Sequence, residues 1–229
     1  MRISLIILIA LTLLTGALFA LQPELDLAGS AFFHGGTGFA GDQPFLKALR
    51  AVLYYLPVGV MGAFALAWIG ARLGLPIPPA LRPSGRSVMF LTLGLALGPG
   101  LLVNAVLKDN WRRPRPVQVT QFGGPLEFRP WYRTDGGCVK NCSFVSGETS
   151  GAFWLVAPAS LAPASLRLPA MAAALGVGLT TGALRVAFGG HFPSDAIFAG
   201  LFTLLLVALL RRILIRPDTQ GLRDDDPHL

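Results

Sequence analysis

The chain has 229 residues, of which 53% are hydrophobic and only 14% are charged, and its mean hydropathy is +0.59. A soluble globular domain carries about 25% charged residues, so this composition excludes a chain whose whole surface faces water. The net charge of +7 is typical of many nucleic-acid-binding proteins, but the arginines cluster at the ends of apolar runs, as in membrane proteins, and we expect no nucleic-acid partner.

Six apolar segments follow one another along the chain and predict helices that lie in a bilayer. They span approximately residues 3–21, 51–74, 87–107, 149–164, 170–187 and 196–215. A bilayer core of about 30 Å requires roughly 20 apolar residues in a helix, and four of the segments meet this length. The fourth and fifth are shorter and rich in Ala, Gly and Ser, which indicates close packing inside a bundle. We therefore predict an all-α integral membrane protein, a six-helix bundle forming a single domain over residues 1–229.

The first segment also resembles a secretory signal peptide. Met1-Arg2 precedes the apolar stretch, and Ala17-Leu-Phe-Ala20 follows it. The apolar stretch is long for a signal peptide, which favours a retained first helix. The predicted side of every other segment is the same in both cases.

The distribution of charged residues predicts the side of the membrane that each loop faces. Arginines are concentrated in three regions. Arg72, Arg82 and Arg86 lie between helices two and three with no acid among them, Arg167 lies in the short turn after the fourth segment, and the C-terminal end carries Arg211, Arg212 and Arg216. The positive-inside rule places these regions in the cytoplasm. The slightly acidic stretch 22–50 is then outside, together with 108–148 and 188–195. We predict a multi-pass protein of a bacterial inner membrane, with a long periplasmic loop between helices three and four.

This long loop is itself basic, which breaks the positive-inside rule. Between residues 108 and 140 it carries seven Lys or Arg against three Asp or Glu. Basic residues on the outer side do not help to orient the protein in the membrane, so we expect them to have another function. Binding an anion is the simplest such function. The alternative is an inverted topology, against which the other loops argue.

The loop also contains the two cysteines of the chain, Cys138 and Cys142. An even pair in an oxidising compartment predicts a disulfide. The alternatives are two free thiols or half of a metal site, and a metal site would require more Cys or His nearby.

The first of three polar patches is KDNWRRPRP at 108–116, where the third helix leaves the membrane. We expect Lys108, Arg113 and Arg115 to reach an anion just above the bilayer. Taken alone, the patch is equally typical of arginines and a tryptophan at a membrane interface.

The second patch is FVSGET at 144–149. Ser146 is predicted to cap the fourth helix, Gly147 to let a ligand approach the backbone, and Glu148 to lie in the first turn. The free N–H groups of a helix N-terminus bind phosphate readily. An ordinary capped helix with an acid in its first turn has the same pattern.

The third patch is LRVAFGGHFPSDA at 184–196. Arg185 lies near the outer end of the fifth helix, where a charge usually has a function. An Asp that accepts a hydrogen bond from one imidazole nitrogen makes the other nitrogen more basic. We expect Asp195 to orient His191 in this way, and His191 to act as a nucleophile or general base.

The three patches lie on the same predicted face of the membrane. A nucleophilic imidazole among the cations Lys108, Arg115 and Arg185 suits attack on phosphorus, because such cations stabilise the charge on the equatorial oxygens. The sequence contains no evident acidic cluster for a divalent ion, so we predict chemistry without a metal or another cofactor.

The order of these motifs resembles that of the type 2 phosphatidic acid phosphatase superfamily of lipid phosphatases. The pattern is Lys, six residues and Arg-Pro; then Ser-Gly; then Arg, five residues, His, three residues and Asp. The matching residues are Lys108, Arg115, Pro116, Ser146, Gly147, Arg185, His191 and Asp195. The resemblance covers residues 108–195 and the six-helix layout. It implies a phosphohistidine intermediate on His191, no metal, and a lipid phosphate of the membrane as substrate and partner.

Two positions depart from the family pattern. Glu148 stands where the middle motif Pro-Ser-Gly-His has its histidine, and Leu184 replaces the usual serine before Arg185. The histidine normally protonates the leaving oxygen. Glu148 could supply this proton if its pKa were raised, although nearby cations would lower it. The leaving group could instead need little help, or the protein could bind its lipid without catalysis. The intact set of His191, Asp195 and cations favours catalysis.

Several substrates fit this pattern. Lipid A phosphates, undecaprenyl diphosphate, phosphatidylglycerol phosphate and phosphatidic acid all remain open, with a slight preference for a lipid A or other glycolipid phosphate because the loop is so rich in cations. A non-catalytic lipid-phosphate-binding or small transport protein is the alternative function. No protein partner is predicted. A second Ser-Gly motif, Pro83-Ser84-Gly85-Arg86, precedes the lysine motif and lies on the predicted cytoplasmic side.

Overall fold

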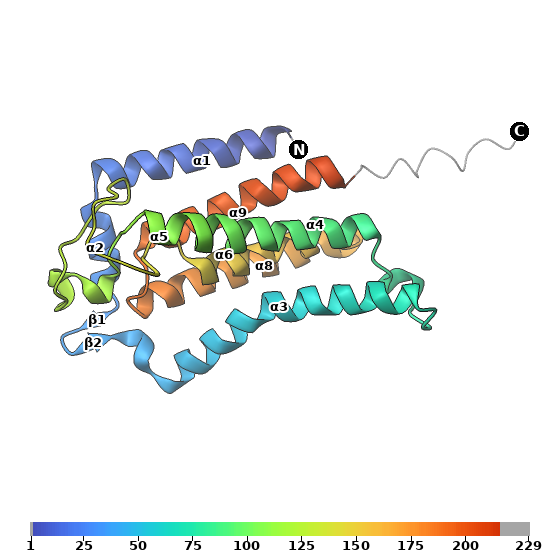
Figure 1. The fold of residues 1–229 in the computed structure, drawn as a ribbon, viewed down its shortest axis with the longest axis horizontal. Coiled ribbons are helices and arrows are strands. Elements are labelled where there is room, and N and C mark those ends of the chain that lie inside the picture. The colour runs from blue at the N-terminus through green and yellow to red at the C-terminus, as the bar shows by residue number, and fades with distance from the viewer. Residues whose placement is uncertain (1, 216–229) are drawn as a thin grey trace, which may run out of the picture.

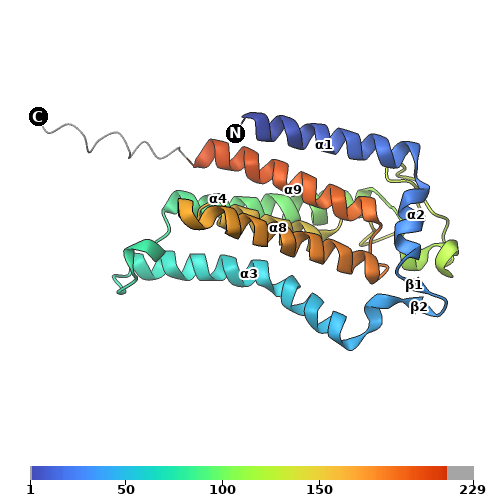
Figure 2. The same cartoon turned by 180° about the vertical axis from the view of Figure 1, so that it is seen from behind.

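The computed structural model describes residues 2–215, whose regular secondary structure is almost entirely helical, as predicted (Figure 1). The longest helices are α1 (Arg2–Leu21), α3 (Pro44–Arg72), α4 (Gly85–Leu95), α8 (Ala164–Ala187) and α9 (Pro193–Leu214). They extend along the long axis of the molecule, and α1 packs against α9 (Figures 1 and 2). The chain is a multi-pass membrane protein by the length and hydropathy of these helices.

Four continuous helical stretches are long and apolar enough to cross a membrane. They are 44–72, 85–107, 164–187 and 193–214. A fifth is obtained if α1 and α2 (Glu24–Ala31), which meet at 89°, are taken as one bent span. By length and composition, the described part of the chain therefore supports four or five of the six predicted membrane helices.

The difference lies in the apolar segment predicted at 149–164. It forms two short helices, α6 (Gly147–Trp154) and α7 (Val156–Ala159), and not one span. Residues 149–154 of α6 are all buried in the bundle. This segment is apolar because it contacts other helices. A helix buried among other helices does not need the length that is required to cross a bilayer.

Small residues around α6 allow the helices to approach closely, as the composition of the fourth and fifth segments predicted. A Cβ atom on Gly178 of α8 or Gly200 of α9 would lie 2.8 Å from the ring of Phe153. The indole of Trp154 is fully buried, and its Nε1–H donates to the carbonyl oxygen of Leu91 at 3.1 Å. α6 is therefore the centre of the core, and its N-terminus is held firmly at one end of the bundle.

The helix that begins as α4 continues as a π-helix, η3 (Ala96–Leu107), and ends in α5 (Lys108–Asn110). Pro99 lies inside η3 and has no N–H for a helical hydrogen bond. The side chain of Asn104 donates to the Pro99 carbonyl oxygen at 2.6 Å. π-helical segments often occur at functional sites, and this one leads directly to Lys108.

The connections at one end of the bundle contain short elements. A hairpin of β1 (His34–Gly35) and β2 (Gly38–Phe39) follows α2, and the other elements there are η1 (Ala40–Asp42), η4 (Pro116–Gln118) and η5 (Thr120–Phe122). The long loop is anchored to α1, because the Nε1–H of Trp131 donates to the carbonyl oxygen of Gly16 at 3.1 Å. Cys138 and Cys142 in this loop are joined by a disulfide.

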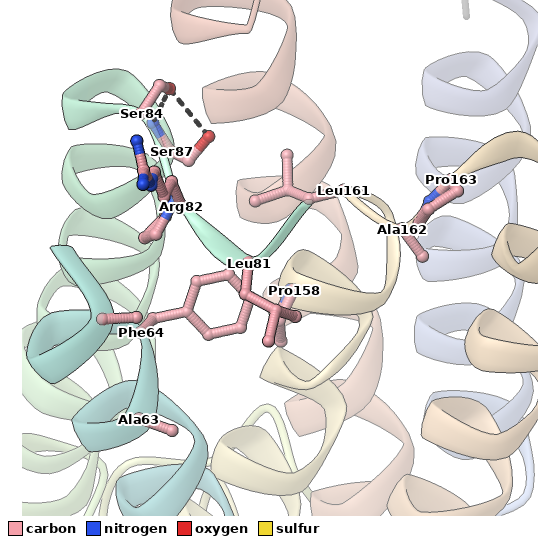
Figure 3. Close-up of a pocket in the computed structure, with 12 residues that line it drawn as sticks. Ala63, Phe64, Leu81, Arg82, Ser84, Ser87, Pro158, Leu161, Ala162 and Pro163 are labelled. Carbon is pink, nitrogen blue, oxygen red and sulfur yellow. Dashed lines mark hydrogen bonds between the residues drawn. The ribbon is translucent and has the colours of Figure 1, made fainter. Parts of the chain in front are cut away.

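The opposite end of the bundle contains η2 (Pro79–Leu81) and a cavity of about 520 Å³ beside it (Figure 3). Phe64, Leu81 and Pro158 line its apolar part. Ser84 is the N-cap of α4 and accepts a hydrogen bond from the N–H of Ser87 at 3.1 Å. The second Ser-Gly motif therefore has a structural role, far from Lys108.

Candidate active site

The predicted site residues come from six segments, Asp195 being in the first turn of α9, and these segments meet at the end of the bundle where α2 and α5 lie (Figure 1). Lys108 belongs to α5, Glu148 to the first turn of α6, and Arg185 to the last turn of α8. His191 lies in the turn between α8 and α9, and Arg115 in the long loop. Helix ends thus bring together residues that are far apart in the sequence.

His191 is almost completely buried, with 2% of its surface exposed. Its Nδ1 lies 2.6 Å from the carbonyl oxygen of Ser143. Because a carbonyl oxygen only accepts, Nδ1 carries the proton and Nε2 keeps its lone pair. Burial, and then the charges of Arg185, Arg115 and Lys108, lower the pKa of His191 well below its usual 6.5. A neutral imidazole whose Nε2 lone pair is free is the form that a nucleophile requires.

Asp195 does not bind His191, so the predicted direct contact between them is wrong. Its carboxylate accepts hydrogen bonds from Arg113 at 2.5 Å, from the N–H of Phe192 at 2.9 Å, and from the hydroxyl of Ser143. The carbonyl oxygen of Ser143 occupies the position beside Nδ1 that Asp195 was expected to fill. Asp195 therefore fixes Ser143, and Ser143 orients His191.

Arg113 was expected to reach an anion, but it is completely buried. Its guanidinium group bridges Asp26 of α2 at 2.6 Å and Asp195 of α9 at 2.5 Å. Asp26 also accepts hydrogen bonds from the N–H and the hydroxyl of Ser194, at 2.8 and 2.7 Å. Arg113 thus joins α2, the long loop and the start of α9, and its charge is compensated within the fold.

Lys108 and Arg115 meet at Asn141. The Nζ of Lys108 donates to Asn141 Oδ1 at 3.1 Å. Arg115 donates from Nε and Nη2 to the Asn141 carbonyl oxygen at 3.0 and 2.8 Å, and from Nη2 to Oδ1 at 2.9 Å. Sequence patterns gave no indication of Asn141, because it lies in an irregular loop outside the motifs.

Arg185 is buried, with 5% of its surface exposed, and lies directly under the turn that carries His191. Its Nε has no hydrogen-bond acceptor among residues 2–215, and the nearest carboxylate oxygen, from Glu148, is 3.5 Å away. A Cβ atom on Gly190 would lie 2.3 Å from Nη2, so the guanidinium group fits there only because residue 190 is glycine. A buried guanidinium with an unused donor suits a bound anion.

Ser146 caps α6, as predicted. Its hydroxyl oxygen accepts hydrogen bonds from the N–H and the hydroxyl of Thr149, at 3.3 and 2.7 Å. Its own N–H donates to the carbonyl oxygen of Asp195 at 3.4 Å, so this donor is already used. At Gly147 a Cβ atom would lie 2.9 Å from Asn104 Oδ1 and 3.4 Å from the Nζ of Lys108. Glycine at this position therefore keeps the space beside Lys108 open.

Glu148 forms a bidentate ion pair with Arg50 of α3. Nε of Arg50 donates to Oε2 at 2.9 Å, and Nη2 donates to Oε1 at 2.6 Å. Burial alone would raise the pKa of Glu148, but the hydrogen bonds from Arg50 and the charges of Arg185, Arg50 and Lys108 outweigh it and hold the pKa below its ordinary value. Glu148 is therefore ionised and holds the side chain of Arg50. An ionised carboxylate has no proton to donate, which argues against the proton-donor role considered from the sequence.

Comparisons with known proteins identify the family of the chain. The family model of the PAP2 superfamily matches residues 88–216. The chain belongs to the PAP2 superfamily. Over 202 residues it is 34% identical to the lipid A 4′-phosphatase of Francisella tularensis subsp. novicida, which covers 86% of this chain and 90% of that protein. It is 35% identical over 209 residues to the lipid A 4′-phosphatase of Rhizobium leguminosarum, covering 85% of this chain and 89% of that protein.

The fold is also that of a solved PAP2 structure. The transmembrane PAP2-type phosphatidylglycerolphosphate phosphatase from Bacillus subtilis superposes with a TM-score of 0.57, covering 97% of this chain and 98% of that one, at 18% sequence identity. At this identity the likeness concerns the fold alone.

In this PAP2 superfamily member, a cavity of about 490 Å³ opens beside Lys108 and Arg50, whereas Arg115, Arg185 and His191 do not line it. Its lining is polar at one end, with Arg50, Asn104, Lys108 and Glu148. The other residues are mostly apolar and belong to the interior stretches of α3, α4, η3 and α6; they include Pro57, Val58, Leu95, Pro99 and Gly151. The cavity thus connects a charged end with an apolar region at the depth of the bundle.

Proposed function

We propose that this PAP2 superfamily protein hydrolyses a phosphate ester of a membrane lipid through a phosphohistidine intermediate, and that its substrate is a lipid A phosphate or a related glycolipid phosphate. The observation that carries the proposal is the state of His191. Its imidazole is neutral and keeps Nε2 available, while the three cations Lys108, Arg115 and Arg185 lie close enough to lower its pKa.

The reaction follows from these groups. Nε2 of His191 attacks phosphorus, the bond from phosphorus to the lipid oxygen breaks, and the lipid leaves as an alcohol after its oxygen has taken up a proton from solvent water. Water then attacks the phosphohistidine and returns a proton to the solvent, which releases inorganic phosphate and restores the imidazole. Lys108, Arg115 and Arg185 stabilise the charge on the equatorial oxygens in both steps. No metal is needed for this sequence of steps.

Asp195 and Glu148 have supporting roles in this proposal. Asp195 holds Ser143, whose carbonyl oxygen keeps the proton of His191 on Nδ1. Glu148 holds Arg50 and lies 3.5 Å from Arg185, so that it fixes cations around the substrate. Of the backbone donors expected at the α6 N-terminus, we retain that of Gly147, because the N–H of Ser146 is engaged.

Two observations support a lipid as substrate. The cavity beside Lys108 has a charged end and an apolar end, which suits a molecule with a phosphate head and acyl chains. The relatives that match most of this chain are named lipid A 4′-phosphatases. A lipid A bearing a 4′-phosphate is therefore the first substrate to test.

We further propose that the site faces the periplasm. The end of the bundle away from His191 carries Arg72, Arg82, Arg86, Arg167, Arg211 and Arg212, where α3 ends, α4 and α8 begin and α9 ends (Figures 1 and 2). The positive-inside rule places this end in the cytoplasm. A disulfide in the long loop suits an oxidising compartment on the other side.

The proposal is tested with protein purified in detergent. Phosphate release is measured with lipid A, undecaprenyl diphosphate, phosphatidylglycerol phosphate and phosphatidic acid, each with EDTA or with orthovanadate. We expect the fastest release from lipid A, inhibition by orthovanadate, and no effect of EDTA. His191→Ala should abolish release, and acid-labile radioactive phosphate should be trapped on the wild-type protein alone. A His191→Ala protein as fast as wild type would exclude the mechanism.

A further inference from the structure

The disulfide of the long loop closes a small ring next to the phosphate site. The Cys138–Cys142 ring consists of residues 138–142, and both half-cystines are buried while Val139 is 85% exposed. Asn141 of this ring has a left-handed backbone conformation, with φ of 52°. Asn tolerates this conformation better than most other residues. Ring closure and the left-handed residue together fix where the carbonyl and amide oxygens of Asn141 point.

These two oxygens hold two cations from different segments. Asn141 Oδ1 accepts from Lys108 and Arg115 at 3.1 and 2.9 Å, and the Asn141 carbonyl oxygen accepts twice from Arg115 at 3.0 and 2.8 Å. Like charges held close together repel each other, so two cations converge on one phosphate only if other groups offset the repulsion. The oxygens of Asn141 do this without adding a negative charge that would compete with the phosphate.

The ring is fixed to the rest of the site on both sides. The N–H of Cys138 donates to the carbonyl oxygen of Arg112 at 3.3 Å, and the N–H of Ser143 donates to that of Arg113 at 2.8 Å. Ser143 directly follows the ring, and its carbonyl oxygen accepts from His191. One short covalent ring therefore sets the position of two cations through Asn141 and borders the residue that orients the nucleophile.

We propose that Asn141 is a positioning residue for phosphate binding, and that the Cys138–Cys142 disulfide keeps it in place. This deepens the proposed function and rests on it for the identity of the substrate. Loss of the Asn141 side chain lets Lys108 and Arg115 separate, which weakens binding of the phosphate group. Loss of the disulfide releases the ring and has the same effect through the backbone.

The test compares three variants with wild type and one matched control. Asn141→Gly keeps the left-handed backbone and the main-chain carbonyl but removes Oδ1. Asn141→Asp keeps an oxygen at this position but adds a negative charge. The double variant Cys138→Ala/Cys142→Ala opens the ring without leaving a free thiol. Val139→Ala is the control, because it alters an exposed side chain of the same ring.

Two measurements separate positioning from stability. The first is the inhibition constant of orthovanadate, together with the KM and kcat for the lipid; the second is the dissociation constant of inorganic phosphate from calorimetry, which needs no lipid. We expect Asn141→Gly and the double cysteine variant to raise KM and both anion constants by about tenfold, as suits the loss of hydrogen bonds to charged groups. Asn141→Asp raises them further because its carboxylate competes with the anion, and Val139→Ala leaves them unchanged.

Each contrary outcome has a distinct meaning. Wild-type anion constants in Asn141→Gly overturn the role of Asn141, even if its thermal stability is lower. Wild-type constants in the double cysteine variant overturn the role of the disulfide. If the wild-type protein hydrolyses none of the lipids but binds phosphate, the proposed function fails while the anion constants still decide the positioning role. A wild-type protein that binds neither anion overturns both.

Discussion

The replacement Asp195→Asn distinguishes the arrangement described here from a direct contact between Asp195 and His191. Asp195 and Arg113 are both completely buried and lie 2.5 Å apart. The replacement keeps the shape of the side chain but removes its charge, and Arg113 keeps Asp26 as its remaining carboxylate partner. Breaking a buried ion pair by removing one partner costs about 3–5 kcal/mol. Because Asp26 remains, we expect a loss near the lower value, about 3 kcal/mol, in the free energy of unfolding.

The effect on the reaction should be smaller than the effect on stability. The Nδ1–H of His191 keeps its acceptor, the carbonyl oxygen of Ser143, in the Asp195→Asn protein. We therefore expect kcat per folded molecule to fall by less than about a hundredfold, whereas loss of a carboxylate that directly holds a catalytic imidazole costs roughly 10⁴. The midpoint of thermal unfolding should fall by about 10 °C, at roughly 2–4 °C per kcal/mol for a chain of this size.

The assay combines thermal unfolding in detergent with phosphate release, normalised to the amount of phosphohistidine formed in the first turnover. Asp135→Asn is the matched control, because Asp135 pairs with Arg133 on an exposed surface, and it should change neither quantity. A fall of kcat by about 10⁴ with an unchanged unfolding midpoint would show that Asp195 acts directly on His191. It would refute the role assigned to Ser143.

Three further predictions concern the groups around the nucleophile. Glu148→Gln keeps an acceptor for Arg50 and should lower kcat by less than about tenfold, while loss of a general acid would cost about 10²–10⁴; initial rates with lipid A decide between them. Gly190→Ala places a Cβ atom 2.3 Å from Nη2 of Arg185, and a displaced guanidinium should lower kcat/KM by about a hundredfold, whereas an unchanged value would show that Arg185 is not needed. Because the pKa of His191 lies well below 6.5, kcat/KM should stay constant from alkaline pH down to 6.5 and fall only at lower pH, as Nε2 takes up a proton. A midpoint at or above pH 6.5 would contradict the burial of a neutral imidazole.

The sequence predicted the helical class and most helix positions, because apolar runs of sufficient length are unambiguous. It predicted that 149–164 would pack inside the bundle, but not that this segment would divide into the two short helices α6 and α7. Hydropathy measures the preference of a segment for an apolar environment, and neighbouring helices satisfy this preference as well as lipid does. Whether 149–164 crosses the membrane therefore depends on how the helices pack, and a single sequence does not reveal this packing.

The sequence predicted that Lys108, Arg115 and Arg185 would lie near His191. It did not predict their hydrogen bonds, the presence of Arg50, or the burial of Arg113. The motif spacing suggested a contact between His191 and Asp195, yet the carboxylate turns toward the N–H of Phe192 and toward Arg113. A carboxylate in the first turn of a helix commonly stabilises that helix end. The sequence alone does not show whether Asp195 has this role or binds His191.

Other partners left no trace in the sequence. Arg50 and Glu148 are 98 residues apart and meet only because α3 packs beside α6. The backbone carbonyl of Ser143 is an acceptor that every residue type would offer, so residue identity carries no information about it. Such contacts depend on tertiary structure and are beyond the range of motif analysis.

Glu148 places a second basic residue beside Lys108 at the polar end of the cavity. It holds Arg50 of α3 there by two hydrogen bonds. Arg50 also lies over the ring of Phe188, with its guanidinium carbon 5.4 Å from the ring centre. The polar end of the cavity therefore gains a fixed cation from α3, at the point where the cavity continues toward its apolar lining. In the proposed function, this anchored cation favours a substrate whose head group carries negative charge or hydrogen-bond acceptors beyond the phosphate that His191 attacks, and a glycolipid phosphate meets that requirement better than a simple phosphatidic acid.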